Sequence, residues 1–168
     1  MTATNHALTG AALAMLIKRP ELAIPAAFLS HFVLDAIPHY NPPKMTKRHF
    51  KNYQDAWLKK LKLRSFRIIF TTDMLLFLIV LLTVPLLAPS SVSPLTVLFS
   101  AFAGAAPDFD GGLKFLLRQL GLLRKKTKEN DWFGRYHIAV QWMERPWGIY
   151  IEAIWFGFII WAISRLIR

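Results

Sequence analysis

The chain contains no cysteine, so neither a disulfide nor a thiolate metal site can stabilise it. Any metal ion that it binds must be held by histidine, aspartate or glutamate, together with water. Acidic residues are also few: 10 aspartates and glutamates stand against 21 lysines and arginines, giving a formal net charge of +11. Glycine-rich nucleotide-binding motifs and a Gly-x-Ser-x-Gly nucleophile motif are absent. The sequence therefore indicates neither a nucleotide-loop protein nor a serine hydrolase.

Hydrophobic residues make up 54% of the chain and occur in long blocks with few polar interruptions. Soluble domains of this length rarely have such a pattern, whereas integral membrane helices require it. The first charged residue, Lys18, follows the first apolar block, so this block lacks the basic start of a signal peptide. We expect residues 1–168 to form a single integral membrane domain of the all-α class, a polytopic transmembrane helical bundle.

Turn residues and changes in composition divide the apolar blocks into five predicted helices. They cover about residues 4–17, 21–37, 66–88, 94–106 and 147–164. The first two are short for a full span of ~20 residues. Their alanines and glycines permit close backbone approach, so we expect them to form a tightly packed N-terminal hairpin.

Two segments, 44–65 and 113–135, are rich in lysine and arginine and are predicted to be basic amphipathic interfacial helices. Such segments lie on a membrane surface and contact anionic lipid headgroups. Both segments adjoin apolar blocks, so we expect membrane lipids as partners and no nucleic acid. The positive-inside rule places both segments in the cytoplasm, which predicts a bacterial or archaeal inner-membrane protein. The orientation of the first hairpin stays open.

The stretch from Ser30 to His39 carries the strongest chemical signal. His31 and Asp35 are four residues apart, so they lie on one face of a helix. His39 follows four residues later, although Pro38 ends the helix and leaves the direction of His39 open. Two imidazoles and a carboxylate among apolar neighbours could hold one divalent metal ion. A buried hydrogen-bonded pair of His31 and Asp35 is the alternative without a metal.

Other ionisable residues are expected at the same depth, in the cytoplasmic leaflet. Ionisable groups in apolar helices are costly and face a cavity or one another, so a single shared site is predicted. Its candidate metal ligands are His6, His31, Asp35, His39, Asp108, Asp110 and His137. Asp73 and Glu152 lie inside apolar blocks and are predicted to act as catalytic general bases.

Structural roles stay open for several of these groups. Asp108 and Asp110 could belong to a helix-ending turn, because aspartate and the following glycine favour turns. Asp73 and Glu152 could instead form structural ion pairs with arginines.

A site of imidazoles and carboxylates suits zinc best, with manganese or magnesium as alternatives. Such an ion activates a bound water and neutralises charge on a phosphoryl oxygen. A site in the inner leaflet between basic segments would receive a membrane lipid or isoprenoid with an anionic headgroup. We therefore predict a metal-dependent hydrolase of a phosphoester or phosphodiester. The alternative is a non-enzymatic membrane carrier or assembly factor whose buried polar layer binds an ion.

These residues resemble those of the family of predicted membrane-bound metal-dependent hydrolases. The resemblance lies in His6 with Gly10, in Ser30-His31 through Asp35 to Pro38-His39, and in Gly104-x-x-Pro107-Asp108-x-Asp110. It implies a membrane-bound protein with metal-dependent hydrolytic activity.

The His-x-x-x-Asp element is also similar to a metal-binding element of zinc-dependent phospholipase C and the related single-strand nucleases. That similarity implies that His31 and Asp35 are metal ligands. A second such element is absent, as is the His-Arg-x-x-Thr-His-Ser element of many membrane members; only His137 could take the place of the latter.

Overall fold

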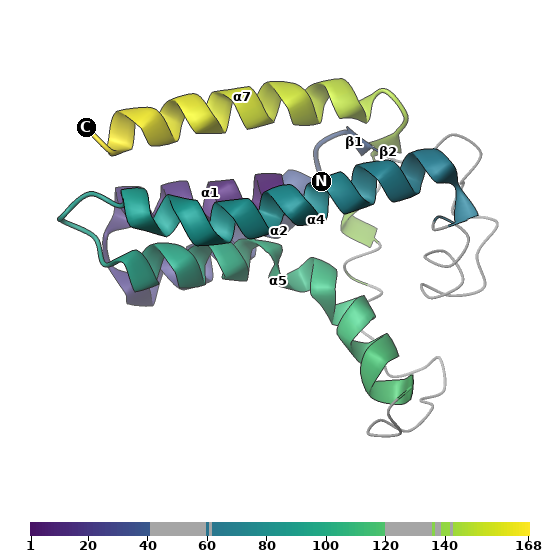
Figure 1. Ribbon diagram of the computed structural model, residues 1–168, viewed down its shortest axis with the longest axis horizontal. Coiled ribbons are helices and arrows are strands. Elements are labelled where there is room, and N and C mark those ends of the chain that lie inside the picture. The colour runs from purple at the N-terminus through teal and green to yellow at the C-terminus, as the bar shows by residue number, and fades with distance from the viewer. Residues whose placement is uncertain (41–59, 61, 120–135, 137–138, 142) are drawn as a thin grey trace.

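The computed structural model describes residues 1–40, 60, 62–119, 136, 139–141 and 143–168; for residues 110–119 it describes the backbone alone. This part of the chain is mostly helical, as predicted, with five α-helices, one short 3-10 helix and two two-residue strands (Figure 1). Helices α1 (Ala3–Ile17), α2 (Pro20–Asp35), α4 (Arg64–Thr83) and α5 (Pro94–Gln119) pack together, and α7 (Gly148–Leu166) lies along one side against α1.

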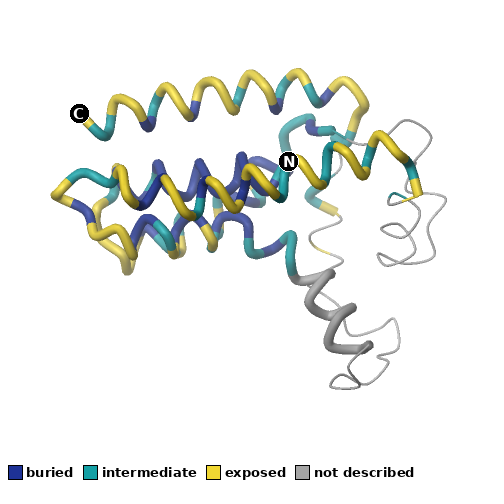
Figure 2. Tube along the Cα trace, viewed as in Figure 1, coloured by how far each residue is buried: buried dark blue, intermediate teal, exposed yellow. Residues whose placement is uncertain are grey.

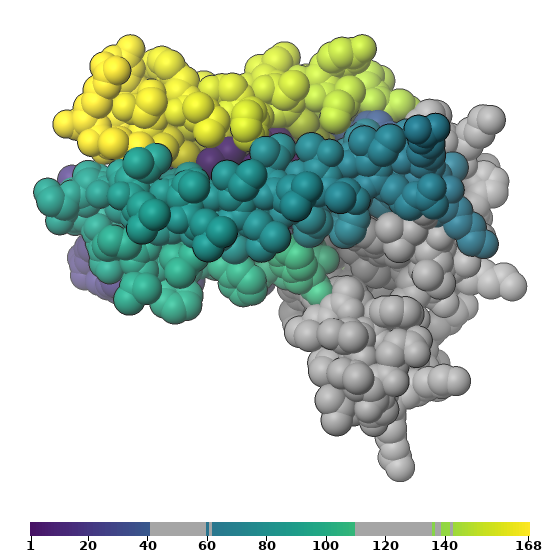
Figure 3. Space-filling view, in the orientation of Figure 1, coloured from purple at the N-terminus to yellow at the C-terminus, as the bar shows by residue number. Residues whose placement is uncertain are grey.

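Helix α1 (Ala3–Ile17) is the centre of the structure. It packs against α5, α2, α7 and α4, and nearly all of its residues are buried (Figure 2). In the space-filling view it is visible only as a strip between α4 and α7 (Figure 3). Alanine, leucine and threonine make up most of its sequence, and a helix with small or apolar residues all round is suited to such a buried position.

Helix α2 (Pro20–Asp35) forms the predicted hairpin with α1. The turn between them uses Lys18 in the left-handed conformation, with φ 64°, and its N–H donates to the carbonyl of Ala14. Pro20 begins α2 because it has no N–H to lose at that position. The helix ends at Asp35, two residues before the predicted end, because the chain must become extended ahead of Pro38.

Two glycines set the close crossing of α1 and α5 (Pro94–Gln119). A Cβ atom on Gly10 would lie 2.2 Å from the carbonyl oxygen of Ser100. A Cβ atom on Gly104 would lie 2.5 Å from the carbonyl oxygen of His6. Both distances are below van der Waals contact, so only glycine fits at these positions.

Helix α5 runs through Pro107, so the predicted end at residue 106 was wrong. A proline removes one helical hydrogen bond, and here the helix bends away from the bundle instead of ending (Figure 1). The predicted interfacial segment 113–135 therefore begins inside α5, and its residues beyond 119 lie outside the described part of the chain.

Helix α4 (Arg64–Thr83), extended by the 3-10 helix η2 (Val84–Leu87), and helix α7 (Gly148–Leu166) are long and apolar enough to cross a membrane. Only 22% and 17% of their most apolar windows are buried inside the protein. The core helix of a soluble protein would be mostly buried, whereas the apolar outer faces of these two helices are largely left uncovered by the described residues. Most of the predicted segment 44–65 lies outside the described residues.

A short parallel ladder joins the segment that follows α2 to the segment that precedes α7. Strand β1 (His39–Tyr40) pairs with β2 (Glu144–Arg145), with His39 opposite Glu144. Gly148, at the start of α7, lies directly on this ladder, since its Cβ atom would be 2.3 Å from the carbonyl oxygen of His39. The ladder fixes the end of α2 beside the start of α7.

Gly10→Ala is expected to reduce the free energy of unfolding by about 1–3 kcal/mol, because the added methyl group overlaps the Ser100 carbonyl. Thermal unfolding of the detergent-solubilised protein would measure the change. Gly157→Ala on α7 is the matched control, since no atom of the described residues lies within 4 Å of its Cβ position. Equal effects of the two substitutions would contradict the proposed close crossing.

Candidate metal centre

Four ionisable side chains from three helices meet beside the crossing of α1 and α5. His6 comes from α1, His31 and Asp35 from α2, and Asp108 from α5. The first three are fully buried, whereas the Asp108 side chain is 23% exposed. One potential ligand atom each from His6, His31 and Asp108 lies within 4.8 Å of the other two. Asp108 therefore forms the side of the cluster that a water or substrate can reach.

The two imidazole rings stack with their centroids 4.0 Å apart, and both Nε2 atoms face the carboxylates. Asp35 lies 3.1 Å from Nε2 of His6 through Oδ1 and 3.2 Å from Nε2 of His31 through Oδ2. Asp108 lies 3.9 Å from each of the same two nitrogens. Two carboxylates thus converge on two imidazole nitrogens, an arrangement of donor atoms that zinc sites use.

The orientation of His31 is fixed by the backbone. Its Nδ1 lies 2.9 Å from the carbonyl oxygen of Gly104, which belongs to the helical turn of α5 just before Pro107. A carbonyl can only accept, so Nδ1 carries the proton and Nε2 of the neutral ring presents its lone pair to Asp35. A lone pair and a carboxylate repel each other, so either a proton or a metal ion must lie between them. A backbone acceptor on the distal nitrogen is also the usual arrangement of metal-bound histidines.

Positive charge is strongly favoured at this place, as the amino group of Met1 illustrates. It is buried and donates to Oδ1 of Asp35. Burial opposes its charge, but the carboxylates of Asp35, Glu152 and Asp108 outweigh burial and raise the pKa of this amino group above its ordinary value. The surroundings of Asp35 therefore attract cations.

Gln141 is a site residue that the sequence analysis missed. Its side-chain amide donates to Oδ2 of Asp35 at 2.9 Å, from the segment that precedes β2. Gly104, the acceptor for His31, was quoted only as part of the family resemblance. No periodicity marks Gln141, because it lies between the predicted helices and reaches Asp35 through the tertiary fold.

Asp73, from α4, holds the N-terminus of α1. Its two carboxylate oxygens accept from the backbone N–H groups of Ala3 at 2.9 Å and Thr4 at 3.0 Å. Its own carbonyl accepts from the hydroxyl of Thr4 at 3.0 Å. The first N–H groups of a helix have no partner within the helix and favour a negative charge. Asp73 therefore supplies the cap that the side chain of Thr2, the N-cap residue of α1, does not provide.

Glu152, from α7, holds the same end of α1. One carboxylate oxygen accepts from the N–H of Thr2 at 3.0 Å, and the other accepts from the N–H of Tyr40 in β1 at 2.8 Å. The amide of Asn5 also donates to the Glu152 backbone carbonyl at 3.1 Å. These contacts give Glu152 and Asp73 structural positions beside the cluster, and their role as general bases stays a prediction.

His39 is buried but contacts other groups. Its Nδ1 donates to the carbonyl of Ile37 at 2.9 Å, and its Nε2 lies 4.0 Å from Glu144. Burial lowers the pKa of its imidazole to about 4, and the Met1 ammonium adds to this effect. Of the other predicted ligands, the Asp110 side chain and His137 lie outside the described part of the structure.

No protein-family model, no curated protein and no solved structure matches the chain. Two imidazoles and the carboxylate of Asp108 lie close enough together that they could hold a divalent cation, and Asp108 gives the group a partly open side.

Asp73→Asn is expected to reduce the free energy of unfolding by about 0.5–2 kcal/mol, because α1 loses a charged cap. Metal content should stay unchanged. Glu21→Gln, which removes an exposed carboxylate paired with Arg19 in the first turn of α2, is the control and should change little. If Asp73→Asn left the free energy of unfolding unchanged but abolished the predicted hydrolase activity, the result would favour Asp73 as a general base instead.

Proposed function

We propose that this protein is a membrane-embedded, metal-dependent hydrolase that acts on a phosphoester or phosphodiester of a lipid or isoprenoid. The observation that carries the proposal is the convergence of the His6 and His31 nitrogens with Asp35 and Asp108. These groups come from three helices, so their meeting is a property of the fold and not of one local motif. The same residues carry the resemblance to predicted membrane-bound metal-dependent hydrolases, and we propose membership of that family.

Zinc is the proposed ion, because nitrogen and carboxylate ligands suit it, with manganese or magnesium as alternatives. When bound, the metal would supply an activated water and neutralise charge on the phosphoryl group. Neighbouring groups of the protein would hold the metal ligands in position. Gly104 fixes the ring of His31, Gln141 holds Asp35, and Asp108 faces the accessible side.

We also propose that the helices form a polytopic bundle in the cytoplasmic membrane of a bacterium or archaeon. The exposed faces of α4 and α7 support this, since leucine, isoleucine and phenylalanine cover them. A soluble monomer rarely exposes so large a continuous apolar surface. The net charge of +11 supports contact with anionic lipid headgroups.

A non-enzymatic ion-binding protein, either a carrier or an assembly factor, is the second candidate. The observation that favours it is the use of Asp73 and Glu152 as caps for α1, which occupies the carboxylates predicted to act as bases. In that case the metal would hold α1, α2 and α5 together without turnover.

Metal analysis of the purified protein is the first test. The proposal requires about one zinc ion per chain, and His31→Ala or Asp35→Ala should reduce the content at least roughly tenfold. His39→Gln is the matched histidine control and should keep the metal, because His39 contacts Ile37 and Glu144. A wild-type protein without metal, purified with zinc in the buffer, would refute the metal site.

A phosphate-release assay on the wild type and Asp108→Asn distinguishes a hydrolase from a non-enzymatic ion-binding protein. Because Asp108 is the exposed member of the cluster, we expect release of phosphate from dioleoyl phosphatidic acid or farnesyl phosphate to fall by roughly 100-fold or more. Activity would be measured in detergent micelles, with Glu21→Gln as a surface-carboxylate control. Zinc-loaded wild-type protein that releases no phosphate from either substrate would favour the non-enzymatic function.

A further inference from the structure

The two stacked imidazoles of the cluster differ in which ring nitrogen carries the proton. His31 donates from Nδ1 to the carbonyl of Gly104, so its neutral ring has a lone pair at Nε2. Nδ1 of His6 is buried and has no hydrogen-bond partner among the described residues, whereas its Nε2 lies 3.1 Å from Oδ1 of Asp35. A buried N–H without an acceptor is costly, so the proton of neutral His6 belongs on Nε2, where Asp35 accepts it. Neutral His6 therefore presents a donor to the carboxylates, and neutral His31 presents a lone pair.

The two carboxylates divide their oxygens between the two rings. Nε2 of His6 lies 3.1 Å from Oδ1 of Asp35 and 3.9 Å from Oδ2 of Asp108. Nε2 of His31 lies near the other oxygen of each carboxylate, 3.2 Å from Oδ2 of Asp35 and 3.9 Å from Oδ1 of Asp108. The cluster thus has two similar positions for a cation, the His6 side and the His31 side, each with one imidazole nitrogen and one oxygen from each carboxylate.

On the His6 side, the oxygen of Asp35 already has two donors. Oδ1 accepts from the Met1 amino group and from Nε2 of His6. A carboxylate oxygen has two lone pairs, so these two donors use both of them. A metal ion on this side would have to displace the ammonium and move the proton of His6 to Nδ1, which has no acceptor among the described residues.

On the His31 side, the nearby atoms suit a metal ion. The lone pair of Nε2 and one oxygen each of Asp35 and Asp108 meet there. Neighbouring ligand atoms of a tetrahedral zinc ion are about 3.4 Å apart, because zinc–nitrogen and zinc–oxygen distances are about 2.0–2.2 Å. The observed separations of 3.2 and 3.9 Å are close to this value. The amide of Gln141 donates to the same oxygen of Asp35, and ligating carboxylates commonly accept such a bond.

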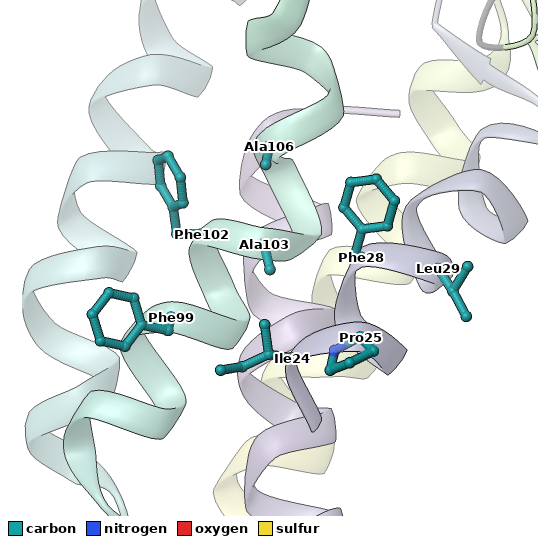
Figure 4. A pocket seen from close by; sticks show the side chains of 8 residues that line it. All are labelled: Ile24, Pro25, Phe28, Leu29, Phe99, Phe102, Ala103 and Ala106. Atoms are coloured by element: carbon teal, nitrogen blue, oxygen red, sulfur yellow. The ribbon is translucent and has the colours of Figure 1, made fainter. Parts of the chain in front are cut away.

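The apolar surroundings add no ligand atom to this side. An open groove between α2 and α5 is lined by eight apolar residues, and none of them belongs to the cluster (Figure 4). The protein ligands must therefore come from the cluster itself, and water would complete the coordination at the exposed side of Asp108.

We propose that the cluster binds its metal ion on the His31 side, through Nε2 of His31, Oδ2 of Asp35 and Oδ1 of Asp108. His6 is then a positioning residue and not a ligand, because it donates to the oxygen of Asp35 that does not bind the metal. One imidazole with two carboxylates is a ligand set that suits zinc or manganese. The inference rests on the proposed function, because it assigns the ligands of that same site.

Nitrogen NMR of the detergent-solubilised protein with labelled histidines tests the assignment directly. Without metal, we expect protons on Nδ1 of His31 and on Nε2 of His6. Added zinc should convert Nε2 of His31 to the metal-bound form, while Nε2 of His6 keeps its proton. Single histidine substitutions assign the signals. Metal-bound signals from both rings would overturn the proposal, because His6 would then be a ligand.

The same substitution at the two stacked rings separates a ligand from a positioning residue. Glutamine places an amide N–H near the position of Nε2, so His6→Gln keeps the bond to Asp35 and should leave the affinity for zinc nearly unchanged. His6→Ala removes this donor and should weaken zinc binding roughly tenfold. His31→Gln removes the ligand lone pair and should weaken zinc binding roughly 100-fold or more. Equal losses in His6→Gln and His31→Gln would overturn the proposal.

Unfolding temperature is measured for every variant, so that loss of zinc is separated from loss of the fold. If His6→Gln does not fold, the wild-type spectra alone decide whether His6 is a ligand. Zinc bound through both imidazoles would overturn the ligand set and leave the proposed hydrolase standing. Wild-type protein that binds no zinc would overturn the ligand set and the proposed hydrolase together.

Discussion

The buried carboxylate of Asp35 is the group on which the arrangement of the other elements depends. A buried charge is costly unless it is neutralised locally, and Asp35 is fully removed from solvent. His6 from α1, Gln141 from the segment before β2 and the Met1 amino group all contact it. Satisfying this one carboxylate therefore joins α1, α2 and the approach to α7.

The position of His6 in turn depends on how closely α1 can approach its neighbours. Gly10 and Gly104 allow the backbones of α1 and α5 to touch, and Gly104 lies directly against the carbonyl of His6. Asp73 and Glu152 hold the N-terminus of α1 from α4 and α7. A methyl group added at either glycine would push α1 away from α5 and so shift His6 relative to His31. The close approach of these two helices is therefore needed both for the core and for the site.

The sequence predicted most of the helices and the residues that their spacing brings together. The contact between His31 and Asp35 could be predicted, because residues four apart lie on the same face of any α-helix. Asp108 could be added because costly groups in apolar segments tend to meet. The kink at Pro107 could not be predicted, because a proline ends some helices and bends others according to what the helix packs against. The contacts of Gln141 and the pairing of β1 with β2 are long-range and leave no local pattern.

The four carboxylates near the N-terminus of α1 differ in the hydrogen-bond donors that surround them. These four are Asp35, Asp73, Asp108 and Glu152. Backbone N–H groups at the N-terminus of α1 donate hydrogen bonds to Asp73 and Glu152. These bonds stabilise both negative charges without a bound ion. Asp35 and Asp108 instead lie beside two imidazoles, Asp35 also accepts from the Met1 amino group, and Nδ1 of His31 donates to the carbonyl of Gly104. Nε2 of His31 can therefore meet a carboxylate oxygen favourably only as a protonated nitrogen or through a bound cation. The Met1 ammonium and the amide of Gln141 compensate Asp35, so Asp108, the partly exposed carboxylate beside the same two Nε2 atoms, is the group at which a further cation would be stabilised.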